Sequence, residues 1–268
     1  MERQPGFGPV LSSMVGLTNI TGWPDRDPVN PYGAYTDFIV PRFAVASILA
    51  ALDYRRRTGK GTHLDMSQLE ASIHFSSPFL LDYIVNNREA VRMGNRDHGA
   101  APHGAYPCAG EDRWIAIAVM NDPEWKALVR AMDNPTWADD PCFVTNEGRI
   151  VNQDDLDTHI GAWTATQNDY ALTNLLQAAG VRAGVCQKPG DRVELDPQLS
   201  ARGWWQTLPH SELGDSVHDG VSPRLSMTPG RLRTAAPLIG EHTREVLGSL
   251  LALTTAELDE YDAAGVFM

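Results

Sequence analysis

The sequence predicts an α/β protein with more than one domain. AYPC and WIAIAV flank the turn AGEDR within residues 105–120, which is the pattern of a β-hairpin. Amphipathic helical patterns follow, and VRAGVCQ returns to a strand pattern, so helices and strands alternate. At 268 residues the chain exceeds the usual size of one domain, and its 43% hydrophobic content is that of a globular protein.

The N-terminal third is dominated by an apolar helix. Residues 43–52 (FAVASILAAL) carry no charge on any face, which is typical of a helix buried on all sides. Pro41 is expected as its first residue, since a first-turn proline gives up an N–H that lacks a partner. Arginines 55–57 then fall in the last turn and Gly59 ends the helix. The sequence therefore predicts a central, buried helix of about four turns.

Asp37 is the candidate catalytic residue. Residues 18–35, which precede it, are rich in Pro, Gly, Asn and Asp and predict a long irregular loop. Asp37 is expected at the end of that loop, where the partial positive charge of a helix N-terminus favours an ionised carboxylate. Such a carboxylate is a candidate nucleophile or base. The alternative is that Asp37 only caps the helix.

The elements after this helix follow from local signals. Residues 63–66 alternate in polarity as a short strand does, and Ser67 with Glu70 forms a capping box before one helix that reaches residue 85. Residues 86–104 have no periodicity and predict a mobile loop. Helices are expected near 122–132, 152–164 and 170–179, and helix returns after Ala236.

Composition excludes several classes of protein. A net charge of −12 argues against a nucleic-acid or anionic-membrane surface. The three cysteines are widely spaced without a CxxC pair, and the histidines lack further ligands at suitable spacing, so neither a disulfide framework nor a metal site is expected. No signal-peptide pattern opens the sequence and no uncharged apolar run approaches the roughly 20 residues that span a bilayer. We expect a cytoplasmic protein that does not bind membranes.

Four stretches resemble one enzyme family. YTDFIVPRFAVASILAALDYRRRTGKGTHLDMSQLEAS, from residue 35, resembles the segment of class III CoA-transferases (the CaiB/BaiF family) in which an Asp precedes a buried helix and a TGKG turn. GNRDHGAAPHGAYPCAGEDRWIAIAV, DPQLSARGWW and APLIGEHTREVLGSLLALTTAELDEYDAAGV are similar to later family segments, in the same order.

The resemblance implies an architecture. It implies part of a large Rossmann-like α/β domain plus a small α/β domain, as in the family's interlocked dimers, without the N-terminal coenzyme-binding part of the large domain. Residues 1–95 would be the middle of the large domain, 96–195 the small α/β domain, and 196–268 a C-terminal segment that returns to the large domain. A homodimer, or a heteromer with a related subunit, is expected.

The resemblance also implies an activity. An acyl-CoA:carboxylate CoA-transferase would move coenzyme A between carboxylic acids through an anhydride and a CoA thioester of Asp37. Its partners would be an acyl-CoA and a carboxylic acid, with no permanently bound cofactor. A partner that supplies the N-terminal half is expected to be needed for activity. Two alternatives stay open: a non-catalytic subunit or incomplete fragment, and an acyl-CoA racemase or isomerase.

Further site residues are implied by position. Phe7, in the glycine turn PGFGP, stands where transferases carry an aromatic residue and related racemases a histidine base, which argues against racemisation. Gln68 would line the substrate pocket. Gly94, Asn95 and Gly99 would form the loop that closes over the site, although the glycines here are separated rather than consecutive.

Overall fold

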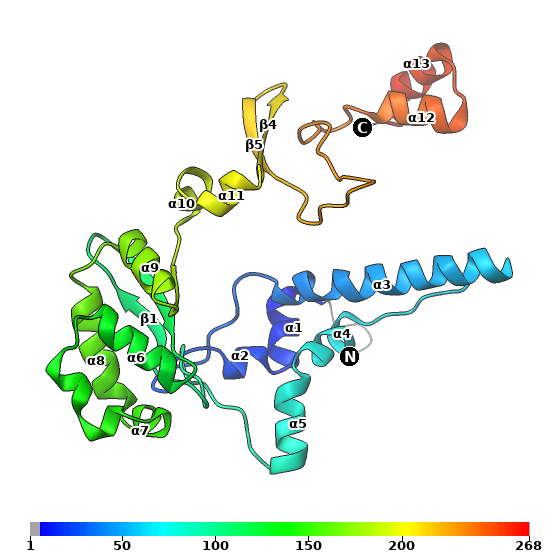
Figure 1. The fold of residues 1–268 in the computed structure, drawn as a ribbon. Helices are drawn as coiled ribbons and strands as arrows, with labels where there is room; N and C mark the ends of the chain where they lie inside the picture. The colour runs from blue at the N-terminus through cyan, green and yellow to red at the C-terminus, as the bar shows by residue number, and fades with distance from the viewer. Residues whose placement is uncertain (1–5, 268) are drawn as a thin grey trace. The chain divides into compact units, whose positions relative to one another are not determined.

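The computed structural model describes residues 6–267, so Pro5 of the predicted glycine turn lies outside it. The chain divides after Cys186 into two compact units. The N-terminal part of the first unit is helical and contains α1 (Gly8–Met14), α2 (Leu17–Ile20), α3 (Tyr35–Thr58), α4 (Gln68–Phe75) and α5 (Ser77–Asn86) (Figure 1). The boundary expected at residue 95 falls inside the first unit, and the three-part division stays a prediction.

The apolar helix begins earlier than predicted. α3 starts at Tyr35, so Pro41 lies inside the helix and Asp37 in its first turn rather than in the preceding loop. An interior proline removes only the hydrogen bond that its N–H would donate four residues back, to the carbonyl of Asp37, and the helix continues through it. The other end matches the prediction, with Gly59 at a φ of 74° after the arginines of the last turn.

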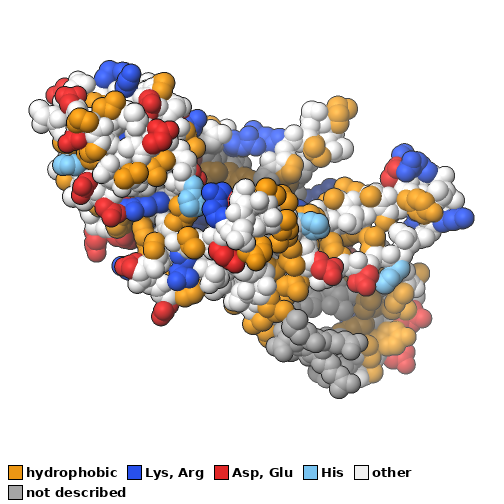
Figure 2. Space-filling view, turned by 90° about the horizontal axis from the view of Figure 1, so that it is seen from below, with side chains coloured by type: hydrophobic (Ala, Val, Ile, Leu, Met, Phe, Trp, Pro, Cys, Tyr) orange, Lys and Arg blue, Asp and Glu red, His pale blue; other side chains and the backbone are white. Residues whose placement is uncertain are grey.

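The burial predicted for this helix is wrong for the described chain. Only Thr36 and Ile39 of α3 are buried, whereas Val45 and Leu49 are 56% and 60% exposed. Hydrophobic side chains, coloured orange, accordingly lie at the surface in Figure 2. α3 is also the one helix in the described residues that is long and apolar enough to cross a bilayer, which is weak evidence because the core helix of a soluble protein meets the same criterion.

Two predictions about the segment after α3 are corrected. Residues 63–66 form no strand, because a strand needs a neighbouring strand to accept and donate its backbone hydrogen bonds. Ser67 caps α4 as predicted and accepts a hydrogen bond of 3.3 Å from the Glu70 backbone. The helix then breaks at Ser76, where the Ser76 N–H and hydroxyl both bond the Ile73 carbonyl, and α5 follows as a separate helix.

The rest of the first unit is a small α/β layer. Its three strands, β1 (His103–Pro107), β2 (Trp114–Ala118) and β3 (Arg182–Val185), form an antiparallel sheet in the order β1-β2-β3. The predicted hairpin is confirmed, with Ala105 opposite Ala116. The connecting helices are α6 (Asp122–Ala131), α7 (Asn146–Val151), α8 (Gln153–Thr164) and α9 (Asp169–Ala178), with short 3-10 turns at Thr136–Asp139 and Pro141–Phe143.

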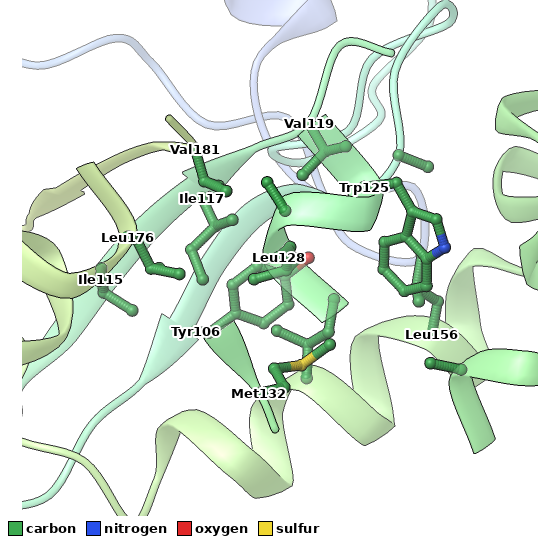
Figure 3. Packing of buried hydrophobic residues seen from close by; sticks show 14 of the residues in the cluster. Tyr106, Ile115, Ile117, Val119, Trp125, Leu128, Met132, Leu156, Leu176 and Val181 are labelled. Atoms are coloured by element: carbon green, nitrogen blue, oxygen red, sulfur yellow. The ribbon is translucent and has the colours of Figure 1, made fainter. Parts of the chain in front are cut away.

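A single hydrophobic core joins this sheet to its helices. Ile115 and Ile117 on β2 are fully buried, while Trp114 and Ala116, which alternate with them, are exposed, so one face of the sheet is covered. Leu128, Leu156 and Leu176 bring α6, α8 and α9 onto that face. Figure 3 shows these side chains pointing toward one another together with Tyr106, Val119, Trp125, Met132 and Val181.

The second unit is built from short elements. They are α10 (Pro189–Glu194), α11 (Pro197–Ala201), the antiparallel hairpin of β4 (Trp205–His210) and β5 (Gly214–Asp219), α12 (Thr243–Leu251) and α13 (Thr255–Ala263). Trp204 and Trp205 are both half-buried. Arg244 on α12 forms ion pairs with Asp259 and Asp262 on α13, which link these two helices.

Candidate active site

Asp37 lies where the start of α3 meets α4. It occupies the first turn of α3, and its side chain is exposed. Its backbone N–H donates to the Ala34 carbonyl at 2.8 Å, so the turn that holds it is closed. The remaining first-turn N–H groups carry the partial positive charge of the helix terminus, which favours an anionic side chain there.

Gln68 contacts Asp37 directly. It is the first residue of α4, and its Nε2 donates to Asp37 Oδ1 at 2.5 Å and to Thr36 Oγ1 at 3.0 Å. One NH₂ group has two hydrogens, so both bonds form together and fix the amide. Thr36 is fully buried, which anchors the pair to the protein interior. Sequence reasoning missed Thr36; its only local signal is a hydroxyl residue beside the predicted Asp.

Phe7 lies at the same corner of the fold. It is the N-cap residue of α1, and its ring is exposed. The next residue, Gly8, packs so closely on Ala34 that a Cβ at Gly8 would lie 2.1 Å from the Ala34 Cβ. Since Ala34 is the N-cap of α3, the N-termini of α1, α3 and α4 meet around Asp37. The corner offers backbone N–H donors and partial positive charge to an anionic group.

The predicted closing loop is irregular, as expected, and is anchored at several points. Gly94 has a φ of 61° and donates its N–H to the Gly22 carbonyl at 2.8 Å, and a Cβ there would lie 2.4 Å from the Trp23 ring. His103 Nδ1 donates to the Asn95 carbonyl at 2.5 Å. Only glycine fits at position 94, because both the backbone conformation and the Trp23 ring exclude a side chain.

The other end of this loop is tied to the small α/β layer. The Gly99 N–H donates to Asp97 Oδ1 at 2.8 Å, and Asn146 Nδ2 donates to the Gly99 carbonyl at 2.7 Å. Arg96 pairs with Asp154 and Asp157 on α8. Of the predicted site residues, Asp37 and Gln68 therefore bond each other. The loop residues Gly94, Asn95 and Gly99 bond instead to Gly22, His103, Asp97 and Asn146.

One ion pair lies at the start of this loop. Arg88 donates to both carboxylate oxygens of Asp82 at 2.6 and 2.8 Å, and Asn86 donates to the same group at 2.7 Å. These hydrogen bonds lower the pKa of Asp82 to about 2. Asp82 therefore stays ionised at neutral pH and fixes the end of α5 to the start of the loop.

Curated proteins with similar sequences are named as CoA-transferases, and a CaiB/BaiF family protein has a similar structure. A probable CoA-transferase of Mycobacterium tuberculosis is 30% identical over 262 residues, covering 95% of this chain and 33% of the relative. Succinyl-CoA–D-citramalate CoA-transferase of Chloroflexus aurantiacus is 32% identical over 253 residues, 94% of this chain and 62% of the relative. The crystal structure of a CaiB/BaiF family protein from Brucella suis matches with a TM-score of 0.81 and 27% identity over 92% of this chain and 63% of that chain.

These matches place the chain in its family. The likeness to the Brucella suis structure confirms the predicted mixed α/β fold. The chain spans less than two thirds of the length of these relatives. A model of CoA-transferase family III matches residues 1–243, and the chain therefore belongs to that family, as its sequence predicts.

Proposed function

We propose that this chain is the catalytic portion of an acyl-CoA:carboxylate CoA-transferase in which Asp37 is the nucleophile. One observation carries the proposal: an exposed carboxylate in the first turn of α3 is held by the Gln68 amide at 2.5 Å. A carboxylate that is fixed yet open to solvent on one side is able to meet an incoming thioester.

The first half of the reaction loads coenzyme A onto the enzyme. An Asp37 oxygen attacks the thioester carbonyl carbon of the acyl-CoA, the C–S bond breaks, and CoA leaves as the thiolate. The product is a mixed anhydride of Asp37 and the acyl group. The thiolate then attacks the Asp37 carbonyl carbon, which releases the first carboxylate and leaves an aspartyl-CoA thioester.

The second half reverses these steps on a new carboxylic acid. The acceptor carboxylate attacks the aspartyl thioester and forms a second mixed anhydride, again with release of the thiolate. The thiolate attacks the acceptor's acyl carbon, which yields the new acyl-CoA and restores the Asp37 carboxylate. Every intermediate keeps an activated acyl bond, so little free energy is lost in the exchange.

Each addition step places negative charge on a carbonyl oxygen. The first-turn N–H groups of α3 and α4 are the proposed donors to that oxygen, and each such donor contributes roughly 3 kcal/mol in known enzymes. The donors proposed on α3 belong to a helix that starts at Tyr35, not at Pro41. Gln68 orients Asp37, and the Gly94–Gly99 loop is proposed to keep water from the anhydride.

A partner is proposed to complete the enzyme. Val45, Leu49 and Leu52 on α3, and Ile84 and Val85 on α5, are exposed in the described chain. Exposed apolar side chains gathered along a helix mark an interaction site in a soluble protein. We infer that a polypeptide carrying the coenzyme-binding part of the large domain covers α3 and α5, either in a second subunit or in a further portion of the same protein, and that turnover depends on it.

Racemisation has less support. Phe7, at the start of α1, has no ionisable group that could move a proton to the opposite face of a substrate carbon. Proton exchange at the α-carbon in heavy water is expected to be absent.

The decisive variant is Asp37→Asn, which keeps the shape of the side chain and removes the nucleophilic charge. Transfer is measured with the chain alone and with the polypeptide that supplies the coenzyme-binding part. We expect turnover to fall by at least about 10³-fold, with an unchanged circular dichroism spectrum. Asp25→Asn, in the exposed loop before α3, is the matched control. Wild-type transfer by Asp37→Asn would overturn the proposal.

A further inference from the structure

The second unit contains a polar cavity whose lining includes neither Asp37 nor Gln68. It lies between the end of α11, the start of β4 and the loop after β5, and has a volume of about 290 Å³. It is lined by Arg202, Gly203, Trp204, Gln206, Gly220, Val221, Pro223, Arg224, Pro229 and Gly230.

Two glycines let the loop close against the strand. A Cβ at Gly220 would lie 2.4 Å from the Trp204 carbonyl oxygen and 3.4 Å from Gln206 Nε2. A Cβ at Gly230 would lie 2.8 Å from Val221 Cγ1. Both positions therefore accept only glycine without a shift of their neighbours, and the cavity has a closely packed wall.

The cavity carries positive charge without a matching carboxylate. Arg202 and Arg224 line it, and no Asp or Glu does. Arg202 Nη2 donates one long hydrogen bond of 3.4 Å to the Ser222 carbonyl. By contrast, many arginines in the described part of the chain, such as Arg113 and Arg244, pair with carboxylates. Two guanidinium groups therefore line one cavity in a chain of net charge −12.

We propose that this cavity binds a phosphate group. Two guanidinium groups match a dianionic phosphate, to which each donates charge-assisted hydrogen bonds. Gln206, which also lines the cavity, carries a neutral amide that can donate, and Trp204 and Val221 are apolar members of the lining. At about 290 Å³ the cavity holds a phosphate or diphosphate group rather than a whole nucleotide. The phosphate comes either from free inorganic phosphate or from a phosphate of coenzyme A.

Calorimetric titration of the whole chain with inorganic phosphate at low ionic strength tests the proposal, because salt screens such contacts. The double variant Arg202→Gln/Arg224→Gln is expected to bind phosphate at least about tenfold more weakly than wild type. Arg192→Gln/Arg233→Gln removes the same charge from exposed positions of the same unit that do not line the cavity. This control is expected to bind phosphate within about twofold of wild type.

Coenzyme A and 3′-dephospho-coenzyme A distinguish the two sources. If wild type binds coenzyme A more tightly than 3′-dephospho-coenzyme A, and Arg202→Gln/Arg224→Gln loses this difference, the cavity holds the 3′-phosphate. If wild type binds both equally, and the double variant loses binding of inorganic phosphate, the cavity holds free phosphate. Folded wild-type protein that binds no phosphate, or an equal loss in the control, would overturn the proposal. Asp37→Asn is expected to bind phosphate like wild type, so this result is independent of the proposed transfer chemistry.

Discussion

The side-chain amide of Gln68 donates to the carboxylate of Asp37, 31 residues earlier in the chain, at 2.5 Å and to Thr36 at 3.0 Å, which joins the starts of two helices. Through Gln68 the exposed Asp37 carboxylate is linked to the buried Thr36 hydroxyl. Its orientation depends on α4 as well as on its own helix. The proposed nucleophile therefore has a positioning residue that can be tested separately.

Gln68→Leu removes this contact and keeps the size of the side chain. A hydrogen bond to a charged group is worth about 1.5–3 kcal/mol, so we expect kcat to fall by about 10- to 100-fold with little change in stability. Steady-state transfer kinetics check this. Gln198→Leu, on an exposed position of α11, serves as the control and is expected to keep wild-type kcat. An unchanged kcat in Gln68→Leu would remove Gln68 from the site.

The role of the loop at Gly94 can be separated from backbone strain. Gly94 and Gly33 have nearly equal φ values of 61° and 60°, but only Gly94 faces a neighbour, the Trp23 ring. Gly94→Ala and Gly33→Ala therefore share the cost of the left-handed conformation, about 1 kcal/mol. Gly94→Ala must also displace Trp23, and we expect a larger loss of stability and faster hydrolysis of acyl-CoA relative to transfer. Equal effects of the two variants would contradict a closing role for the loop.

Arg149 stabilises the small α/β layer from inside. Its side chain is fully buried, donates to the Ala101 and Phe143 carbonyls at 2.8 and 3.0 Å, and pairs with Asp122 at 2.9 Å. Arg149→Ala leaves these carbonyls without donors and opens a cavity, so we expect the free energy of unfolding to fall by about 3–5 kcal/mol. Urea unfolding followed by circular dichroism measures this. The exposed Arg130→Ala is expected to change stability by less than about 0.5 kcal/mol.

Cys108 gives the fold an alkaline pH dependence. Burial, together with the nearby Asp169 charge, raises the pKa of its thiol from 9.0 to about 11. The unfolded chain loses this proton near pH 9 while the folded chain keeps it, so the thiol's contribution is complete below pH 9 and is lost as the pH rises toward 11. Wild type is therefore expected to lose more stability between pH 8.5 and 10.5 than Cys108→Ser. If the free energy of unfolding falls equally with pH in wild type and Cys108→Ser, the raised pKa of the Cys108 thiol is contradicted.

Local sequence signals predicted much of this fold because their partners are close in the chain. Ser67, for example, caps α4 through Glu70, which is only three residues away. The hairpin of β1 and β2 likewise needs only its own turn and the alternation of Ile115 and Ile117. Signals of this range depend on nothing outside the segment.

The remaining features depend on distant or neighbouring groups. Whether Val45 and Leu49 are buried depends on what packs on α3. The sequence of α3 by itself does not determine this. The start of α3 at Tyr35 depends on Gly8 and Gln68, which pack on its first turn. Asp37 and Gln68 were predicted as site residues from family resemblance. Their contact could not be predicted from the sequence, because it depends on the fold that places α4 beside α3.

The most direct test of the central claim is the intact mass of the chain after brief exposure to acyl-CoAs, with and without the polypeptide that supplies the coenzyme-binding part. We predict a mass increase equal to an acyl or CoA adduct, which maps to Asp37, disappears with hydroxylamine, and is absent in Asp37→Asn. A folded chain that forms no adduct with that polypeptide present, or an adduct that persists in Asp37→Asn, would contradict covalent catalysis by Asp37.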